Sequence, residues 1–147
     1  MYLSYFGIRV SDLEKSLKFY QDLLGLQLIR RGDNTKNGGG LYVLLADKGS
    51  GQRLELNWYP KGSIFATEYN PGEGLDHIGF RVSDVEKETQ RLARLGYQVI
   101  DVPRSISRPQ LGNEYSTRLA YVKDPDSNWI ELYENSGSMA EYDPMTY

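Results

Sequence analysis

The sequence predicts an α+β fold made of two βαβββ modules in tandem, and an internal repeat is the main observation behind this prediction. The stretch LSYFGIRVSD at residues 3–12 returns as LDHIGFRVSD at residues 75–84, and LEL at 54–56 is echoed by IEL at 130–132. Repeats of this kind define an architecture before any local assignment is made. Each half also shows strand-like and helix-like periodicity in the same order. We expect the modules to form a cupped mixed sheet with the helices on its outer face.

Each half begins with a strand that leads into a helix. Residues 3–10 alternate around the apolar Phe6, Ile8 and Val10, which are expected on the buried face of a half-buried strand. Ser11 and Glu14 form the S-x-x-E pattern of a capping box, which predicts a helix start. Gly25 predicts the helix end, because glycine readily adopts the left-handed conformation found there. The first helix has one apolar face at helical spacing, made by Leu13, Leu17, Tyr20 and Leu24. The second half repeats each of these signals: strand 77–82, capping box Ser83 and Glu86, apolar residues Val85, Leu92 and Leu95, and stop Gly96.

Three strand-like runs follow each helix. They cover residues 26–30, 41–46 and 53–58 in the first half, and 98–102, 118–122 and 129–133 in the second. Residues 47–51 and 124–128 are predicted turns, and 60–74 and 103–117 are predicted longer loops of the kind that often bind ligands. We therefore expect one domain with these parts: a first module over 1–59, a connecting loop over 60–74, a second module over 75–134 and a C-terminal tail over 135–147.

Composition narrows the classes of function. The 147 residues include no cysteine, which excludes disulfides and thiolate metal sites and fits a cytoplasmic protein. The net charge of −3 lacks the basic excess of a nucleic-acid binder, and no apolar run is long enough to cross a membrane. The single histidine excludes a site that needs several imidazoles from one chain. Because nucleic acid and membranes are excluded, we expect the partner to be a small-molecule substrate.

Alternation along the strands places four candidate residues on one face. If the apolar residues of each strand pack on the helices, the intervening side chains point to the open side of the sheet. Taken singly, a strand glutamate is usually a solvated residue, and a histidine beside Asp76 is usually structural. Their coincidence at repeat-related positions favours a site, because two carboxylates and an imidazole suit Zn²⁺, Ni²⁺, Co²⁺, Mn²⁺ or Fe²⁺. The four residues are Tyr5, Glu55, His77 and Glu131, and Arg9, Asn57 and Arg81 share their face.

Several segments in order carry a resemblance to the vicinal oxygen chelate superfamily. They are the repeated module start, FYQDLLGL at 19–26, LEL at 54–56, DHIG at 76–79 and KDPDSNWIEL at 123–132. The resemblance covers residues 1–134 and looks strongest to the lactoylglutathione lyase (glyoxalase I) family. It implies divalent-metal chemistry on a substrate with two neighbouring oxygens, and it implies a homodimer, since members of this superfamily often dimerise.

The resemblance also implies roles for the candidate residues. Its four metal positions fall on the same four residues, but the family usually has His or Gln where this chain has Tyr5. We therefore expect three metal ligands, Glu55, His77 and Glu131. Glu131 is our hypothesis for the base that moves a proton alpha to a carbonyl. Tyr5 is expected to donate a hydrogen bond to a substrate oxygen.

Two functions stay open from the sequence. The first is a glyoxalase-type lyase or epimerase that acts through a metal-stabilised enediolate on a small 2-oxo or 2-hydroxy carbonyl substrate. The alternative is a metal-free drug-binding protein of the bleomycin-resistance type, which 12 tyrosines, two tryptophans and an acidic charge would suit. Asp22 stands where the resembling lyases place an arginine for a glutathione carboxylate, which disfavours glutathione. The expected substrate-binding residues are Arg9, Asn57, Arg81, Arg104 and Arg108.

Overall fold

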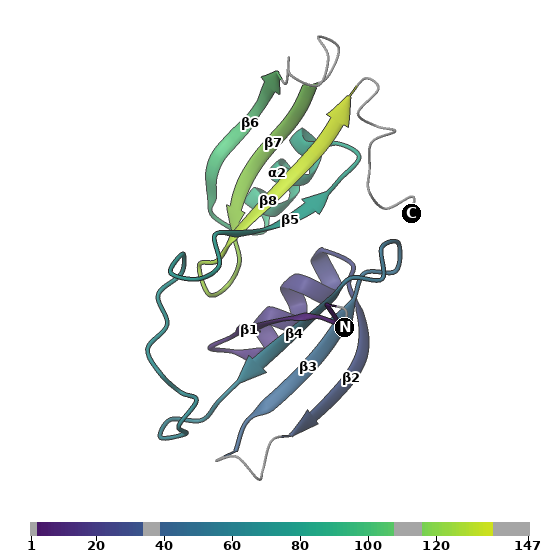
Figure 1. Cartoon of the computed structure of the whole chain (residues 1–147). Helices are drawn as coiled ribbons and strands as arrows, with labels where there is room; N and C mark the ends of the chain where they lie inside the picture. The colour runs from purple at the N-terminus through teal and green to yellow at the C-terminus, as the bar shows by residue number, and fades with distance from the viewer. Residues whose placement is uncertain (1–2, 34–38, 108–115, 137–147) are drawn as a thin grey trace. The chain divides into compact units, whose positions relative to one another are not determined.

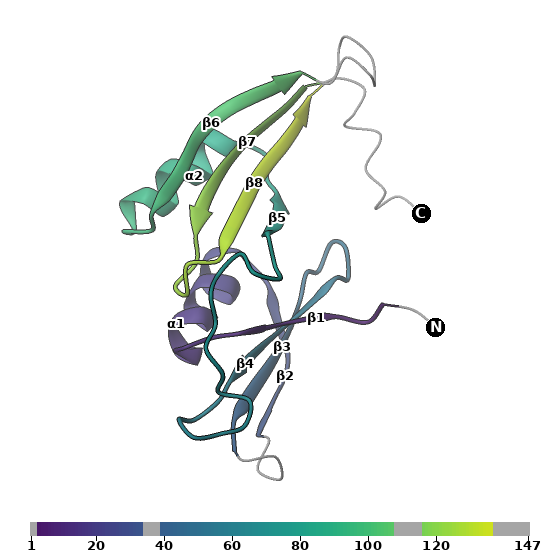
Figure 2. The same cartoon turned by 60° about the vertical axis from the view of Figure 1, so that its left-hand side comes forward.

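The computed structural model of the chain describes residues 3–33, 39–107 and 116–136. The chain divides into two compact units, Met1–Asn70 and Pro71–Tyr147. Each unit holds one four-stranded mixed sheet with a helix on one face (Figures 1 and 2), so the predicted α+β class with two βαβββ modules is confirmed. Within the described ranges no helix is long and apolar enough to cross a membrane.

The first unit has the strand order β1-β4-β3-β2. β1 runs parallel to β4, and the other pairs are antiparallel, because a helix connects β1 to β2 while short connections join the later strands. Its elements are β1 (Phe6–Arg9), α1 (Leu13–Leu17), the π-helical segment η1 (Lys18–Leu23), β2 (Gln27–Asp33), β3 (Leu41–Ala46) and β4 (Arg53–Trp58).

The first helix packs its apolar side against the sheet and widens into η1 near its end. The amide of Leu24 donates to the carbonyl of Phe19, five residues back, at 3.0 Å. Phe19 and Tyr20, although consecutive, are both fully buried and meet edge to face with 5.2 Å between ring centroids. Gly25 then ends the helix with φ of 82°, as its sequence position predicts.

The second unit repeats this plan with the order β5-β8-β7-β6. Its helix packs on β6, β7 and β8, and the residues between helix and sheet are fully buried at Val85, Leu92, Val122 and Ile130. The elements are β5 (His77–Arg81), α2 (Val85–Arg94), β6 (Val99–Ser107), β7 (Ser116–Lys123) and β8 (Trp129–Ser136).

Three local predictions were wrong. Both ends of the loop predicted over 103–117 are strand, because β6 runs on to Ser107 and β7 begins at Ser116, where the two pair antiparallel; residues 108–115 lie outside the described residues. Leu95 is 55% exposed and not part of the helix face, since it lies at the C-cap beyond the last packed turn. Phe6, expected on the buried face of β1, is 57% exposed at the strand start.

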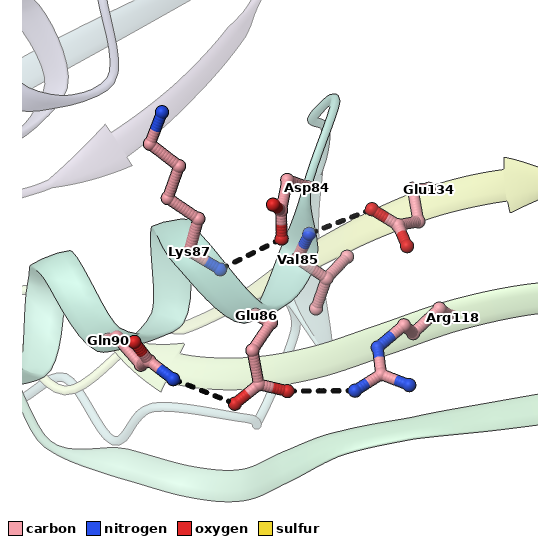
Figure 3. A network of polar contacts seen from close by, with 7 residues as sticks. All are labelled: Asp84, Val85, Glu86, Lys87, Gln90, Arg118 and Glu134. Carbon is pink, nitrogen blue, oxygen red and sulfur yellow. Dashed lines mark hydrogen bonds and ion pairs between the residues drawn. The ribbon is translucent and has the colours of Figure 1, made fainter.

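Both helices begin with a different cap from the one predicted. The N-cap residues are Asp12 and Asp84, not the serines before them. Asp84 Oδ1 accepts from the amide of Lys87 at 2.9 Å, and Glu134 Oε2 on β8 accepts from the amide of Val85 at 2.8 Å (Figure 3). Two carboxylates thus meet the partial positive charge at the helix N-terminus, which stabilises α2 and ties it to the sheet.

Replacement of the cap should separate the two cap assignments. We expect Asp84→Ala to lower the free energy of unfolding by about 1 kcal/mol, because the amide of Lys87 loses its acceptor. Ser83→Ala should change it by less than about 0.5 kcal/mol. Urea denaturation followed by circular dichroism measures both. Equal losses of unfolding free energy in the two variants would contradict the assignment of Asp84 as the N-cap and favour Ser83.

The turn between β7 and β8 is held by a buried polar network. Asp124 Oδ1 accepts from the amides of Asp126 at 2.9 Å and Asn128 at 2.7 Å, and the Asn128 side chain donates to Asp124 Oδ2 at 2.9 Å. Ser127 takes a positive φ of 69° in this turn. Because the turn length sets how the flanking strands pair, this network fixes which β7 residue lies opposite Glu131.

Candidate active site

In the second unit, His77 and Glu131 face one another on neighbouring parallel strands. His77 is the first residue of β5 and Glu131 the third of β8, and Gly79 pairs directly with Glu131. His77 Nε2 lies 3.3 Å from Glu131 Oε2. A Cβ atom at Gly79 would lie 3.5 Å from that same carboxylate oxygen, an ordinary van der Waals contact, so the carboxylate lies directly over β5. His77 and Glu131 therefore lie on the same face of the second sheet, as strand alternation predicts.

The other ring nitrogen of His77 is held by its chain neighbour. His77 Nδ1 lies 2.7 Å from Asp76 Oδ2, a distance typical of a charge-assisted hydrogen bond. In the tautomer that carries its proton on Nδ1, Nε2 has a free lone pair. Histidines that bind metals usually donate their second N–H to a carboxylate in this way. Asp76 therefore orients the ring, and Nε2 faces Glu131.

The donor set of this pair fits a divalent ion. An imidazole nitrogen and a carboxylate oxygen, each about 2.1 Å from a tetrahedral ion, stand about 3.4 Å apart. The distance of 3.3 Å between Nε2 and Oε2 matches that spacing. The Glu131 side chain is 18% exposed and that of His77 34%, so both are partly shielded yet reachable. Two ligands of the predicted centre are thus brought together by one sheet.

Tyr121 contacts both His77 and Glu131 and is not among the residues predicted from the sequence. It lies opposite Glu131 in the β7–β8 pairing, and its hydroxyl donates to Glu131 Oε1 at 3.4 Å. Burial raises the pKa of the Tyr121 phenol and the adjacent carboxylate raises it further, so the phenol keeps its proton and stays a donor. The turn predicted at 124–128 already implied this pairing, since residues equidistant from a short turn oppose each other.

Aromatic and charged side chains surround the cluster. The Tyr121 ring meets the His77 ring edge to face at 5.7 Å and the Trp129 ring at 5.6 Å. Arg104, a predicted substrate-binding residue, lies on β6 and donates through Nε to Asp101 Oδ2 at 2.6 Å. This ion pair raises the pKa of the Arg104 guanidinium and offsets its charge locally. Arg108 lies outside the described residues.

The first unit carries Glu55 at the position equivalent to Glu131. Glu55 lies on β4 between Gly7 of β1 and Leu44 of β3, so its side chain is on the open face as predicted. A Cβ atom at Gly7 would come within 3.3 Å of the Asn57 amide nitrogen, so this glycine gives the predicted substrate-binding amide its space. The repeated glycine of the two module starts thus lies beneath a polar side chain in both sheets.

Tyr5 and the arginines of β1 and β5 differ in their surroundings. Tyr5 stands one residue before β1, is 47% exposed, and lines a shallow pocket with Phe6 and the β3–β4 turn. Arg9 holds the connecting loop, because its guanidinium donates to the Thr67 carbonyl at 2.9 Å and to the Thr67 hydroxyl and lies 5.5 Å from the Tyr69 ring centre. Arg81 is exposed at the end of β5.

No group of three or more His, Cys, Asp or Glu side chains within the described ranges is arranged to hold a metal. The second unit contributes two of the three predicted ligands, and Glu55 belongs to the first. The three-ligand centre therefore stays a prediction.

These features define the class of protein. The chain belongs to the Glyoxalase/Bleomycin resistance protein/Dioxygenase superfamily, whose family model matches residues 2–132. The resemblance noted from the sequence is thereby confirmed.

Three individual proteins are similar to this chain over most of its length. The chain is 33% identical over 134 residues to the lactoylglutathione lyase of Haemophilus influenzae, which covers 89% of this chain and 90% of the relative. Among solved structures it is similar to the trypanothione-dependent glyoxalase I of Leishmania major, with 27% identity, a TM-score of 0.70, and 97% and 92% of the two chains covered. It is also similar to an antibiotic-binding protein of Streptomyces sp. CB03234, with 27% identity, a TM-score of 0.66, and 92% and 97% covered.

Proposed function

We propose that this protein is a divalent-metal-dependent lyase or isomerase of the glyoxalase type. The observation that carries the proposal is the pair of His77 Nε2 and Glu131 Oε2 at 3.3 Å, with Asp76 on the second ring nitrogen. The relatives named lactoylglutathione lyase support the same reaction class. The substrate is a small compound with a carbonyl and an oxygen on the neighbouring carbon.

The residues have distinct roles in this proposal. His77, Glu131 and Glu55 hold the ion, with Glu55 supplied by the first module of this chain or of a second copy in a homodimer. A bound divalent cation supplies positive charge where a substrate oxygen becomes negative. The Glu131 carboxylate takes the proton from the carbon alpha to the carbonyl and returns it to the adjacent carbon. Tyr121 keeps one carboxylate oxygen oriented, and Tyr5 donates to the substrate.

Metal titration and turnover test this proposal together. Protein purified without chelators is analysed for metals, titrated with Ni²⁺, Zn²⁺ and Co²⁺, and assayed with methylglyoxal and a thiol for thioester formation. We expect one ion per site, lost in His77→Ala, and turnover only with metal. A wild-type protein that binds none of these ions and turns nothing over would rule the enzyme out.

The second candidate is a metal-free binding protein, and two observations favour it. Tyr5 replaces a usual ligand, and the described fold is shared with an antibiotic-binding protein at 27% identity. The aromatic cluster of His77, Tyr121 and Trp129 offers ring faces for a flat ligand. Fluorescence quenching of the two tryptophans by an aromatic cationic drug, in protein stripped of metal, would support this candidate.

Asp76 provides a test of how His77 is oriented. We expect Asp76→Asn to weaken metal binding about 10-fold to 100-fold, because the ring loses the carboxylate that holds Nε2 toward the ion. Isothermal titration calorimetry with Zn²⁺ measures the change. Asp126→Asn, in the β7–β8 turn, makes the same change of charge and should leave the affinity for Zn²⁺ unaltered. Equal affinities in wild type and Asp76→Asn would refute the orienting role.

A further inference from the structure

The segment that follows β4, residues 59–69, has an ordered structure of its own, and we call it the strap. The amides of Ser63 and Ala66 each donate to the carbonyl three residues earlier, at 3.1 and 3.0 Å, which makes two successive turns. The Ser63 hydroxyl also accepts from the amide of Phe65 at 3.3 Å. The Phe65 ring then contacts the Tyr59 ring, with 5.3 Å between the ring centres and 32° between the ring planes. The strap is therefore more than an extended linker.

One arginine of β1 anchors the strap to the first sheet. Arg9 lies in the regular part of the sheet, since it pairs with Asn57 of β4. Its guanidinium donates to the Phe65 carbonyl at 3.2 Å, to the Thr67 carbonyl at 2.9 Å and to the Thr67 hydroxyl. Its Cζ atom lies 5.5 Å from the centre of the Tyr69 ring, within the range of a cation–π contact. Hydrogen bonds from a charged donor are stronger than neutral ones, so Arg9 is the main support of the strap.

The chain between the strap and the second sheet is short. The first unit ends at Asn70. Only residues 71–76, with the sequence PGEGLD, then precede His77, the first residue of β5. Gly72 has a positive φ of 93°, and a Cβ atom at Gly74 would meet nothing within 4 Å. Because glycine has the widest range of backbone angles, this stretch can absorb rotation, and we call it the hinge.

We propose that Arg9 is a latch, a contact that holds the strap on the first unit and so confines movement between the units to the hinge. With the latch in place, the six residues 71–76 link the units. Without it, the eighteen residues 59–76 lie between β4 and β5. The root-mean-square span of a flexible chain then rises from about 14 Å to about 23 Å. Arg9 binds the chain itself in this role and does not bind the substrate, as the sequence had led us to expect.

The absence of cysteine allows a direct test of the latch that needs neither metal nor turnover. The exposed residues Lys15 on α1 and Lys87 on α2 are changed to cysteine and labelled with nitroxides. Labelled protein is diluted with unlabelled protein, so that pulsed electron paramagnetic resonance measures distances within one chain. We expect Arg9→Gln to broaden the distance distribution about 1.7-fold, in proportion to the span of the freed chain.

Arg31→Gln is the matched control for this variant. It removes the same charge and also breaks a contact of the first unit, the hydrogen bond of 2.6 Å from Arg31 to Glu14 Oε1 on α1. It leaves the strap in place and should leave the width of the distribution unchanged. Chymotrypsin gives a second readout, because cleavage after Phe65 should be about tenfold faster in Arg9→Gln, which loses charge-assisted hydrogen bonds to the strap, and unchanged in Arg31→Gln.

Two further variants separate the latch from the hinge. Thr67→Val removes the hydroxyl that accepts from Arg9 but keeps the carbonyl and every charge, so it should broaden the distribution less than Arg9→Gln does. Gly74→Ala keeps the latch and should narrow the distribution, because alanine has fewer backbone conformations. Equal widths in wild type and Arg9→Gln, or equal broadening by Arg9→Gln and Arg31→Gln, would overturn the latch. An unchanged width in Gly74→Ala would overturn the hinge.

Discussion

The Glu131→Gln variant should lose about 100-fold to 10,000-fold in turnover, the usual contribution of a general base. Gln keeps the size of the side chain and an oxygen that accepts from Tyr121, but it cannot take a proton from carbon. Its amide also replaces the carboxylate oxygen that lies 3.3 Å from His77 Nε2, so metal affinity should fall as well. Turnover is therefore measured at saturating metal. Unchanged turnover there would remove Glu131 as the base.

Glu134→Gln is the matched control for this variant. Glu134 lies on the same strand but on the helix face, where it accepts from the amide of Val85 (Figure 3). The two variants change the net charge by the same amount. Glu134→Gln should cost up to about 1 kcal/mol of stability, because the helix N-terminus loses a negative charge, and it should keep full turnover. A large loss of turnover in both would indicate a general disturbance of β8.

The second large effect is expected in the core. Leu56 and Leu132 occupy repeat-equivalent positions in β4 and β8 and are 0% and 1% exposed. We expect Leu56→Ala and Leu132→Ala each to lower the free energy of unfolding by about 2–5 kcal/mol, since each leaves a cavity between sheet and helix. Such a loss is a large share of the stability of a domain this size.

Hydrogen exchange measured by mass spectrometry locates the damage from each core variant. Leu56→Ala should speed exchange of β3 and β4, and Leu132→Ala that of β7 and β8, because each leucine packs within its own sheet. Leu95→Ala, at an exposed position, should change the free energy of unfolding by less than about 0.5 kcal/mol. A loss below 1 kcal/mol for both core variants would mean that these positions are not the packed centres of their units.

Much of the fold follows from short-range patterns in the chain. The strands 41–46 and 53–58 were predicted with the bounds that the structure has, because turn signals bound a continuous apolar run in the first and a clean alternation in the second. The strand ends at β6 and β7 were not, since their pairing partners, rather than their own residues, extend them. The helix caps were assigned one residue early because Ser and Asp are both good caps, and only the backbone conformation selects between them.

Some features of the candidate site also follow from the sequence, whereas others depend on contacts between distant residues. Alternation placed Glu55, His77 and Glu131 on open faces, because the direction of a side chain along a regular strand depends on its own backbone alone. The contact of Tyr121 with Glu131 was implied by the turn that joins their strands but not by either residue. The role of Arg9 in holding the connecting loop had no signal in the sequence, since its partners are 56 and 58 residues away.

The repeat by itself determined that the chain has two modules of the same kind, with a polar face that carries the acidic and imidazole side chains. Only the tertiary structure decided that Arg30 shares a face with Glu55 while Arg31 contacts α1, because a bulge shifts the register by one residue and reverses every side chain beyond it. Regular alternation is a property of a single strand. A bulge exists only relative to the strand that pairs with it, and so it is settled when the sheet assembles.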